Sequence, residues 1–240
     1  MGVFRFKKFE VVNERSAMKV NTDCVLLGAA MTIYPSDRTF LDVGTGTGTI
    51  ALMAAQRAVA GSKVYAIDID QVSVEEAAAN FDRSEWASCM SAEHSSLEDF
   101  AASLQPDMHY DLIFSNPPYF ESSLLAPEQR RSNARHTSTG LSYRELLEFA
   151  QLRLTEHGRI SMVLPAEQEA ALCRHARMCG LHLFRIVRVR TVPRKNPVRM
   201  IAEFRRERCE APEEVLLTIQ KEGKYTDEYL SLTRDFYLFA

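Results

Sequence analysis

Long apolar runs are missing from this sequence of 240 residues. No stretch approaches the roughly 18 consecutive apolar residues that a membrane-spanning helix needs. The first eight residues also lack the apolar core of a secretory signal. We therefore expect no membrane segment and no cleaved leader.

Cysteine is scarce, and its pattern is not that of a disulfide framework. The cysteines are odd in number and scattered: Cys24, Cys89, Cys173, Cys179 and Cys209. This usage is typical of a reducing compartment and predicts a cytoplasmic protein. Cys173, His175, Cys179 and His182 could supply zinc ligands, but they span a helix and its exit without a C-x-x-C pair. We predict no metal site there.

A strong overall charge is also absent, because the net charge is only −3. The distribution is uneven, however. Residues 174–208 hold eleven Lys and Arg against two Glu, a local balance of +9 that leaves −12 for the rest of the chain. This asymmetry predicts one face suited to a polyanion. The plainer alternative is a solvated hairpin whose arginines pair with acids.

Hydrophobic residues make up 46% of the chain, enough for one well-formed core. We expect a single domain over residues 1–240 with three parts. Residues 1–36 form an N-terminal extension, with a short hairpin within 4–20 and a helix through 25–33 that Asp23 could cap. Residues 37–208 form the core, and residues 209–240 add a strand and a short helix.

The core alternates between strands and helices. We expect strands at 39–43, 63–67, 89–90, 110–115, 159–164, 182–192 and 199–205, and helices at 50–60, 73–81, after 96, 143–155 and 166–179. The alternation predicts an α/β fold with a parallel sheet covered on both faces. The last two strands have no helix between them and should form an antiparallel hairpin.

The first core strand ends in a glycine-rich loop, Asp42-Val43-Gly44-Thr45-Gly46-Thr47-Gly48, and a helix follows directly. Such a turn lets the backbone approach a ligand, and the helix N-terminus favours a negative group. The dinucleotide fingerprint needs Gly or Ala at 49, where this chain has Thr49. Asp68 ends the next strand and could accept hydrogen bonds from ribose hydroxyls. The alternative is a glycine turn without a ligand.

The fourth strand delivers Asn116-Pro117-Pro118-Tyr119 at the same edge of the sheet. The Asn116 amide oxygen and the Pro117 carbonyl are two acceptors on a stiff turn. They suit an –NH₂ group, because binding both hydrogens directs the nitrogen lone pair. Tyr119 could stack on a flat substrate. The alternative is a proline turn that only ends a strand.

These motifs resemble those of class I S-adenosylmethionine-dependent N-methyltransferases with an N-P-P-Y motif. Within that group, residues 17–23 and 25–28 are similar to the bacterial enzymes that methylate N6 of an adenosine in valine tRNA, immediately 3′ of the anticodon. The likeness covers residues 4–206. It implies a Rossmann-like sheet of seven strands, mostly parallel with an antiparallel C-terminal hairpin. It also implies S-adenosylmethionine as cofactor and tRNA as partner.

The resemblance also assigns residues to sites. Near the cofactor it places Lys19, Thr22, Asp42, Gly44, Gly46, Gly48, Asp68, Ile69, Ser96 and Leu97. Asn116, Pro117, Pro118 and Tyr119 would bind the target adenine. One departure is visible: Ser96 stands where the family often has an acid.

Basic residues near the expected site would neutralise tRNA phosphates. They are Arg135, Arg190, Arg194, Lys195 and Arg199. We expect no membrane, metal or obligate protein partner. Methyl transfer to guanine N2 of ribosomal RNA or to a protein glutamine remains an alternative activity. A degenerate fold that binds tRNA without chemistry is an alternative of another kind.

Overall fold

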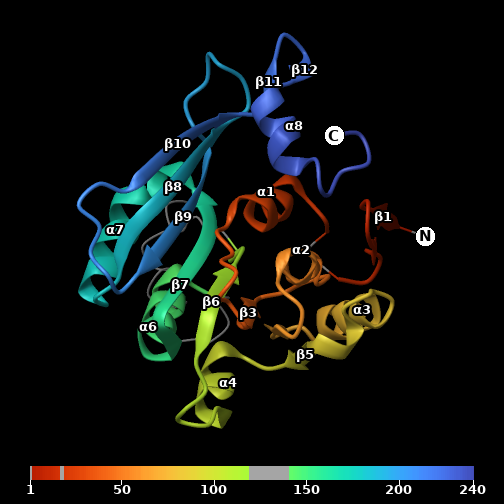
Figure 1. The fold of residues 1–240 in the computed structure, drawn as a ribbon, viewed down its shortest axis with the longest axis vertical. Helices are drawn as coiled ribbons and strands as arrows, with labels where there is room; N and C mark the ends of the chain where they lie inside the picture. The colour runs from red at the N-terminus through yellow and green to blue at the C-terminus, as the bar shows by residue number, and fades with distance from the viewer. Residues whose placement is uncertain (1, 17–18, 119–140) are drawn as a thin grey trace, which may run out of the picture.

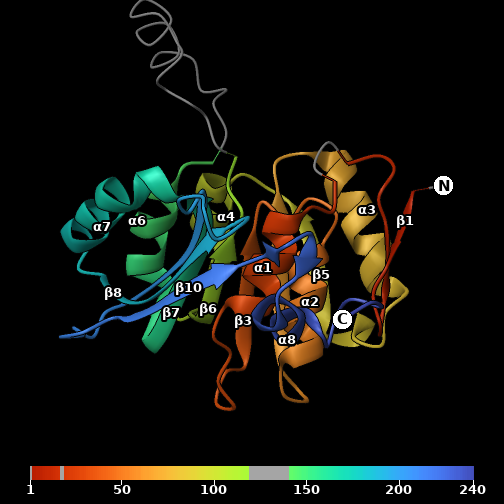
Figure 2. The same ribbon diagram turned by 90° about the horizontal axis from the view of Figure 1, so that it is seen from above.

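The computed structural model of the protein describes residues 2–16, 19–118 and 141–240. Its centre is one eight-stranded sheet with the order β10-β8-β9-β7-β6-β3-β4-β5 (Figures 1 and 2). In chain order the strands are β3 (Thr39–Val43), β4 (Lys63–Asp68), β5 (Met90–His94), β6 (Tyr110–Ser115), β7 (Leu154–Pro165), β8 (His182–Arg190), β9 (Arg199–Arg205) and β10 (Glu213–Thr218). Two small hairpins flank it, β1 (Val3–Arg5) with β2 (Glu10–Val12) and β11 (Gln220–Lys221) with β12 (Lys224–Tyr225).

The strand count corrects the sequence prediction of seven. The seven expected strands are present, and β8 and β9 form the predicted antiparallel pair. The eighth is β10, which adds to β8 in parallel at the edge of the sheet. Val215 and Leu217 of β10 pack into one hydrophobic core, whereas Leu216 between them is exposed. The sequence predicted one strand within 209–240 but did not add it to the sheet, because its alternation of buried and exposed residues is short.

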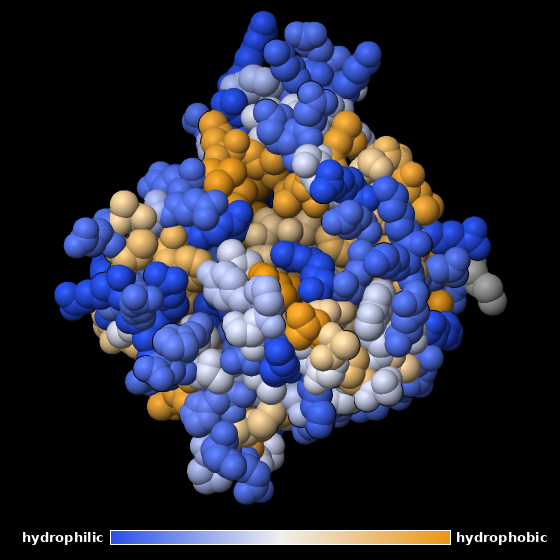
Figure 3. All heavy atoms as spheres, in the orientation of Figure 1, coloured by the Kyte–Doolittle hydropathy of each residue, from blue (hydrophilic) through white to orange (hydrophobic). Residues whose placement is uncertain are grey.

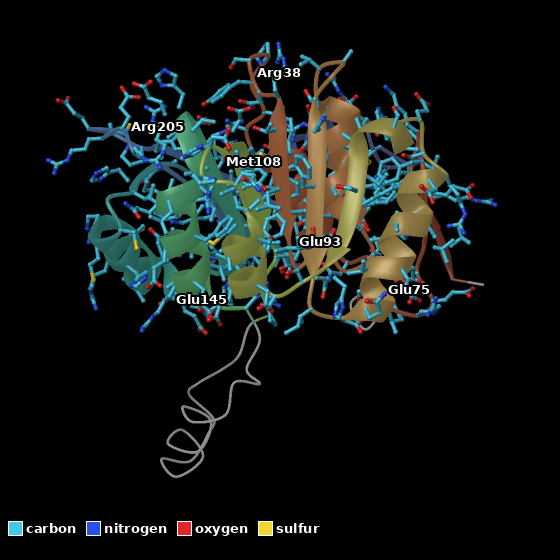
Figure 4. All side chains as sticks on the ribbon, turned by 90° about the horizontal axis from the view of Figure 1, so that it is seen from below. Arg38, Glu75, Glu93, Met108, Glu145 and Arg205 are labelled. Carbon is cyan, nitrogen blue, oxygen red and sulfur yellow. The ribbon has the colours of Figure 1, made fainter. Side chains whose placement is uncertain are left out.

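Within the main sheet, only β9 runs against its neighbours, because every other pair is parallel. The other seven strands therefore end at the same edge of the sheet, where α/β folds bind ligands. Figure 4 shows the two edges. Arg38, just before β3, and Arg205, at the end of β9, lie at one edge, and Glu75 and Glu145, in the helix turns that follow strand ends, lie at the other.

Helices cover both faces of the sheet, as a parallel sheet requires. They are α1 (Thr22–Ala30), α2 (Thr49–Arg57), α3 (Gln71–Asp82), α4 (Leu97–Ser103), α6 (Tyr143–Arg153), α7 (Glu169–Met178) and α8 (Asp227–Thr233), with short 3₁₀ turns at Ala87–Cys89 and Ala166–Gln168. Strand residues alternate between two cores: Phe40 packs with α1, α2 and α8, and Leu41 packs with α6 and α7. Among the described residues, no helix is long and apolar enough to cross a membrane.

The N-terminal extension is attached to α3. Of the predicted hairpin within 4–20, only β1 and β2 form strands. The backbone N–H groups of Glu14, Arg15 and Ser16 donate to the buried Glu76 carboxylate at 2.8–3.0 Å. Burial raises the pKa of Glu76, but the three backbone donors and the Lys19 charge together lower it by more. The pKa of Glu76 is therefore below its ordinary value. The charged carboxylate therefore holds the segment that leads into α1.

Helix α1 begins with a cap that the sequence analysis misplaced. Asn21, not Asp23, is the N-cap: its side-chain oxygen accepts from the backbone N–H of Cys24 at 3.0 Å. Asp23 instead accepts from Arg199 Nε at 2.8 Å. Both residue types are good caps, and the position of the first turn in the fold decides between them.

Three arginines hold the other end of α1. Arg57 donates to the carbonyls of Gly28 and Met31, Arg185 to that of Ala30, and Arg159 to that of Thr32. Their charges are balanced inside the protein by Asp37, which pairs with Arg159 at 2.6 Å, and by the fully buried Glu203, which pairs with Arg185 at 2.9 Å. The free carbonyls at the helix end are thereby satisfied, and α1 is fixed against the sheet.

Candidate cofactor and substrate site

The glycine loop between β3 and α2 bends back over the end of β4. The N–H groups of Gly44 and Thr45 donate to the Ile67 carbonyl at 2.9 and 3.0 Å, and that of Gly46 donates to Asp68 Oδ2 at 2.8 Å. Gly48 has φ +79°, and a Cβ there would lie 2.4 Å from Phe81 Cε1. Glycine at 48 is therefore required both by the backbone angle and by the packing of α3.

Asp42 lies beneath this loop and is fully buried. Its Oδ2 accepts from Thr45 Oγ1 at 2.7 Å, whereas Oδ1 has no hydrogen-bond partner among the described residues. Burial raises the pKa of Asp42 to about 7; the Thr45 hydrogen bond opposes this rise, and the Asp68 charge adds to it. An unpartnered buried carboxylate oxygen is costly, and a cationic group nearby would offset that cost.

Asp68 stands at the end of β4, as the sequence predicted. Besides the bond from Gly46, its Oδ1 accepts from the Asp70 N–H at 2.9 Å. A carboxylate has about four acceptor sites, so both oxygens retain capacity for a ligand. The next residue, Ile69, is 71% exposed. The Ser95 N–H donates to the Asp68 carbonyl at 3.0 Å, which brings the start of α4 beside this strand end.

Ser96 is engaged in capping α4. Its hydroxyl accepts from the Asp99 N–H at 3.0 Å and lies 2.7 Å from Asp99 Oδ2. Leu97, the first residue of α4, is half-buried. The structure thus places Ser96 and Leu97 near Asp68, while the cofactor contact expected of them stays a prediction.

Asn116 faces the glycine loop across a cleft. The buried Ser115 hydroxyl donates to the Val43 carbonyl at 2.7 Å, which joins the ends of β6 and β3. Asn116 follows directly and is half-buried, Pro117 is buried and Pro118 is exposed. The cleft is lined by Lys19, Asn21, Cys24, Gly44, Thr45, Gly46, Thr47, Thr49, Ile50 and Asn116.

The cleft therefore unites the two motifs that sequence reasoning singled out, together with Lys19 from the N-terminal extension. Other residues predicted for the site are not among its lining residues: Thr22, Asp42, Gly48, Asp68, Ile69, Ser96, Leu97, Pro117 and Pro118. Tyr119 and Arg135 lie outside the described residues, so their predicted roles are not addressed by the structure.

Charge is arranged asymmetrically around the cleft. Lys19 and the N-termini of α1 and α2 lie on its walls, and the N-cap residue of α2, Gly48, has no side chain to cap the helix. The Asp42 and Asp68 carboxylates lie under and beside the loop. This arrangement suits a ligand that carries both a carboxylate and a positive charge.

Some lining residues were missed by the sequence analysis. Asn21 and Cys24 line the cleft at the start of α1, Thr47 lines it from the glycine loop, and Thr49 and Ile50 line it from the start of α2. An Asn ahead of an apolar run is a known start signal for a helix, so Asn21 could have been recognised. Cys24 offered no such signal. Its thiol donates to the Asn21 carbonyl, and burial raises its pKa to about 12.

Several arginines of the basic segment 174–208 pair with acids, as the alternative of a solvated hairpin predicted. Arg185 pairs with Glu203 and Glu213, and Arg188 pairs with Glu169 and Glu214. Of the residues predicted to contact RNA, Arg190 donates to Thr218 Oγ1 and to the Pro193 carbonyl, and Arg199 pairs with Asp23. Arg194 and Lys195 are exposed. The positive charge of this segment is therefore partly neutralised, and the exposed cations Arg194 and Lys195 lie in the loop after β8.

The cysteine and histidine group was predicted not to bind metal. Across residues 2–16, 19–118 and 141–240, the structure has no group of three or more His, Cys, Asp or Glu side chains arranged for a metal ion. His175 instead lies 3.2 Å from Glu148.

The Gly48→Ala substitution tests the packing of the loop. It combines a left-handed backbone angle with a clash against Phe81, and we expect a loss of about 2–4 kcal/mol in the free energy of unfolding in urea. Gly61→Ala is the matched control, because Gly61 has φ +87° but open space around its Cβ position. That variant should lose only about 1 kcal/mol. Equal losses would show that the Phe81 contact does not restrict position 48.

Comparison with known proteins agrees with this geometry. The methyltransferase small domain family model matches residues 16–176. The tRNA1(Val) (adenine(37)-N6)-methyltransferase of Bacteroides fragilis is 40% identical over 237 residues, which cover 98% of this chain and 97% of that protein. The protein of the same description from Parabacteroides distasonis is 41% identical over 238 residues, with 98% and 97% covered.

The solved structures show the same fold at low identity. A predicted O-methyltransferase from Agrobacterium tumefaciens has a TM-score of 0.61 and 16% identity, with 88% of this chain and 95% of that chain covered. Because the family model spans more than half of the chain and the relatives match nearly all of it, this chain belongs to the methyltransferase small domain family and, within it, to the tRNA1(Val) (adenine(37)-N6)-methyltransferases.

Proposed function

We propose that this protein transfers a methyl group from S-adenosylmethionine to N6 of adenosine 37 in tRNA1(Val). The observation that carries the proposal is the position of Asn116, which faces the glycine loop across one cleft. Relatives from Bacteroides fragilis and Flavobacterium psychrophilum that match 98% of the chain are named for the same reaction. They favour a tRNA adenine over ribosomal guanine or a protein glutamine.

The residues of the cleft fit S-adenosylmethionine. That molecule carries a carboxylate, an ammonium and a sulfonium group. The cleft is lined by a lysine and by residues of two helix N-termini, and the carboxylates of Asp42 and Asp68 lie under and beside its glycine loop. The unpartnered Oδ1 of the buried Asp42 is the group that most needs a positive neighbour. When bound, S-adenosylmethionine supplies an electrophilic methyl group.

Lys19 and the start of α2 would hold the carboxylate end of the cofactor, and Asp42 and the loop glycines would hold its methionine part. Asp68 would accept hydrogen bonds from the ribose, and the exposed Ile69 would pack on the adenine ring. Thr22, Ser96 and Leu97 border this region. These assignments rest on the charge and position of each group.

Asn116 and Pro117 would bind the target amino group. The Asn116 side-chain oxygen and the Pro117 carbonyl accept its two hydrogens, which directs the nitrogen lone pair toward the methyl group. No strong base is needed first, since the methylated nitrogen becomes acidic and loses its proton readily. Pro118 stiffens the turn, and Tyr119 is proposed to stack on the adenine.

The target nucleotide belongs to a loop, so extruding it costs less than opening a base pair. Arg194 and Lys195 are proposed to contact tRNA phosphates, together with Arg135. Arg190 and Arg199 would act beside them from the positions in which Thr218 and Asp23 hold them. A tRNA substrate and five free cysteines support a cytoplasmic location.

The Asn116→Ala variant tests the proposed chemistry. Losing one of the two acceptors should lower kcat by about 100-fold or more, while the Kd for S-adenosylmethionine changes by less than about threefold. Activity is measured as N6-methyladenosine in digested tRNA by mass spectrometry. Asn116→Asp keeps an acceptor oxygen and should retain more activity than alanine. Normal turnover of Asn116→Ala would contradict this role, and methyl label appearing only in ribosomal RNA or protein would contradict the substrate.

The pH dependence of cofactor binding tests Asp42. Its raised pKa of about 7 means that lowering the pH from 8 to 6 protonates the carboxylate and removes its attraction for a positive ligand. The affinity for S-adenosylmethionine should therefore fall by about tenfold over this range. Asp42→Asn should bind more weakly at pH 8 and lack this component of the pH dependence. Parallel titration curves for the two proteins, measured by calorimetry, would show that Asp42 does not titrate on binding.

A further inference from the structure

Two exposed segments near the C-terminus lie side by side outside the stretch that the family model matches. They are the loop 191–198 between β8 and β9 and the hairpin of β11 and β12. Gln220 N–H donates to the Thr191 carbonyl at 2.9 Å, and Ile219 N–H donates to the Arg190 carbonyl at 3.0 Å. Figure 1 shows both segments projecting together at the top of the molecule, above α1 and α8. We call this pair the C-terminal rim.

The hairpin of the rim holds two like charges in an unfavourable arrangement. Lys221 and Lys224 are directly opposite one another across the two strands. The turn between them is made by Glu222 and Gly223, with φ of 52° and 78°. Like charges facing across a hairpin repel, and a glutamate in the left-handed region is strained. The fold maintains this hairpin at a cost, which suggests a role other than stability.

The cations of the rim differ from the arginines within β8. Arg185 and Arg188 are neutralised by four glutamates. Arg194, Lys195, Lys221 and Lys224 are exposed, and none of them forms an ion pair with a described residue. The acids beside them are Glu222 within the turn and Asp227 and Glu228 at the start of α8, where the helix N-terminus favours negative charge. The rim itself keeps a positive balance.

The rim lies at the edge of the sheet where the cleft opens. Strands β6, β7, β8 and β10 all end there, and the register of β7, β9 and β8 places Pro165, Arg199 and Val189 level with one another. Figure 3 shows a hydrophilic surface over the projecting hairpin. Its aromatic residue, Tyr225, is stacked on Phe239 with ring centroids 5.3 Å apart. The outer turn of the hairpin, Lys221 to Lys224, therefore presents charge, and the apolar area of Tyr225 lies against Phe239.

We propose that the C-terminal rim binds the phosphate backbone of the tRNA, with Lys221 and Lys224 acting together with Arg194 and Lys195. This inference rests on the proposed function and adds the hairpin to the surface that holds the substrate. A phosphate placed between Lys221 and Lys224 would relieve their repulsion, as two cations neutralising one or two phosphates do in other nucleic-acid complexes. The polar, turn-shaped surface suits a nucleic acid backbone better than the apolar centre of a protein interface.

The double variant Lys221→Gln, Lys224→Gln tests the proposal in the full-length protein. Because it removes the repulsion, it should melt at the same or a slightly higher temperature than the wild type. Its Kd for tRNA1(Val) should nevertheless rise by about five- to tenfold at low salt, and the slope of log Kd against log salt should fall by about one to two. The loss should appear as a raised KM for tRNA, with a smaller change in kcat. The Kd for S-adenosylmethionine should stay unchanged.

The matched control is Lys8→Gln, Lys63→Gln. Lys8 lies in the turn between β1 and β2, and Lys63 begins β4 at the opposite edge of the sheet; both are exposed. This control should keep the tRNA Kd and salt slope of the wild type. If the wild type methylates tRNA but the rim variant keeps its KM and salt slope, the proposed tRNA contact of the rim is wrong and the proposed function stands. A wild type that places no N6-methyladenosine in tRNA would instead overturn the proposed function.

Discussion

Two side-chain hydrogen bonds join the ends of three neighbouring strands, and the cleft depends on them. Gly46 N–H donates to Asp68 and ties the loop after β3 to the end of β4, and Ser115 Oγ donates to the Val43 carbonyl and ties β6 to β3. Both hydrogen bonds lie where parallel strands end, so they hold the loop after β3 close to the residues that follow β4 and β6. The glycine loop and Asn116 face one another because these ends cannot separate.

The cleft also needs a wall from the N-terminal extension, and the structure supplies it by fixing α1 at both ends. Arginines from α2, β7 and β8 satisfy the carbonyls at its C-terminal end, and Arg199 pairs with Asp23 in its first turn. Buried ion pairs add little net stability, but breaking one is costly, so such a network favours one position of the helix over others. That position brings Asn21 and Cys24 to the wall of the cleft.

Charge is used in two ways along the same basic segment. Within β8, Arg185 and Arg188 form ion pairs with glutamates and serve the fold. Beyond the end of β8, Arg194 and Lys195 are exposed and lie beside the hairpin of β11 and β12. The edge of the sheet where the parallel strands end thus gains positive charge without an equal number of nearby acids. In the proposed function, this difference would orient a substrate as highly charged as tRNA relative to the cleft.

The sequence by itself determined the alternating α/β order, the antiparallel pair β8 and β9, the two motifs and the residue types that serve them. These are local properties, because periodicity, a glycine turn or a proline turn is visible within a short stretch. Only the tertiary structure decided that Asn21 rather than Asp23 caps α1, that β10 adds an eighth strand, and that Arg185 and Arg188 are neutralised. Each of these depends on partners distant in the sequence, Arg199 for Asp23 and Glu203 for Arg185 among them, whose proximity arises only when the sheet is assembled.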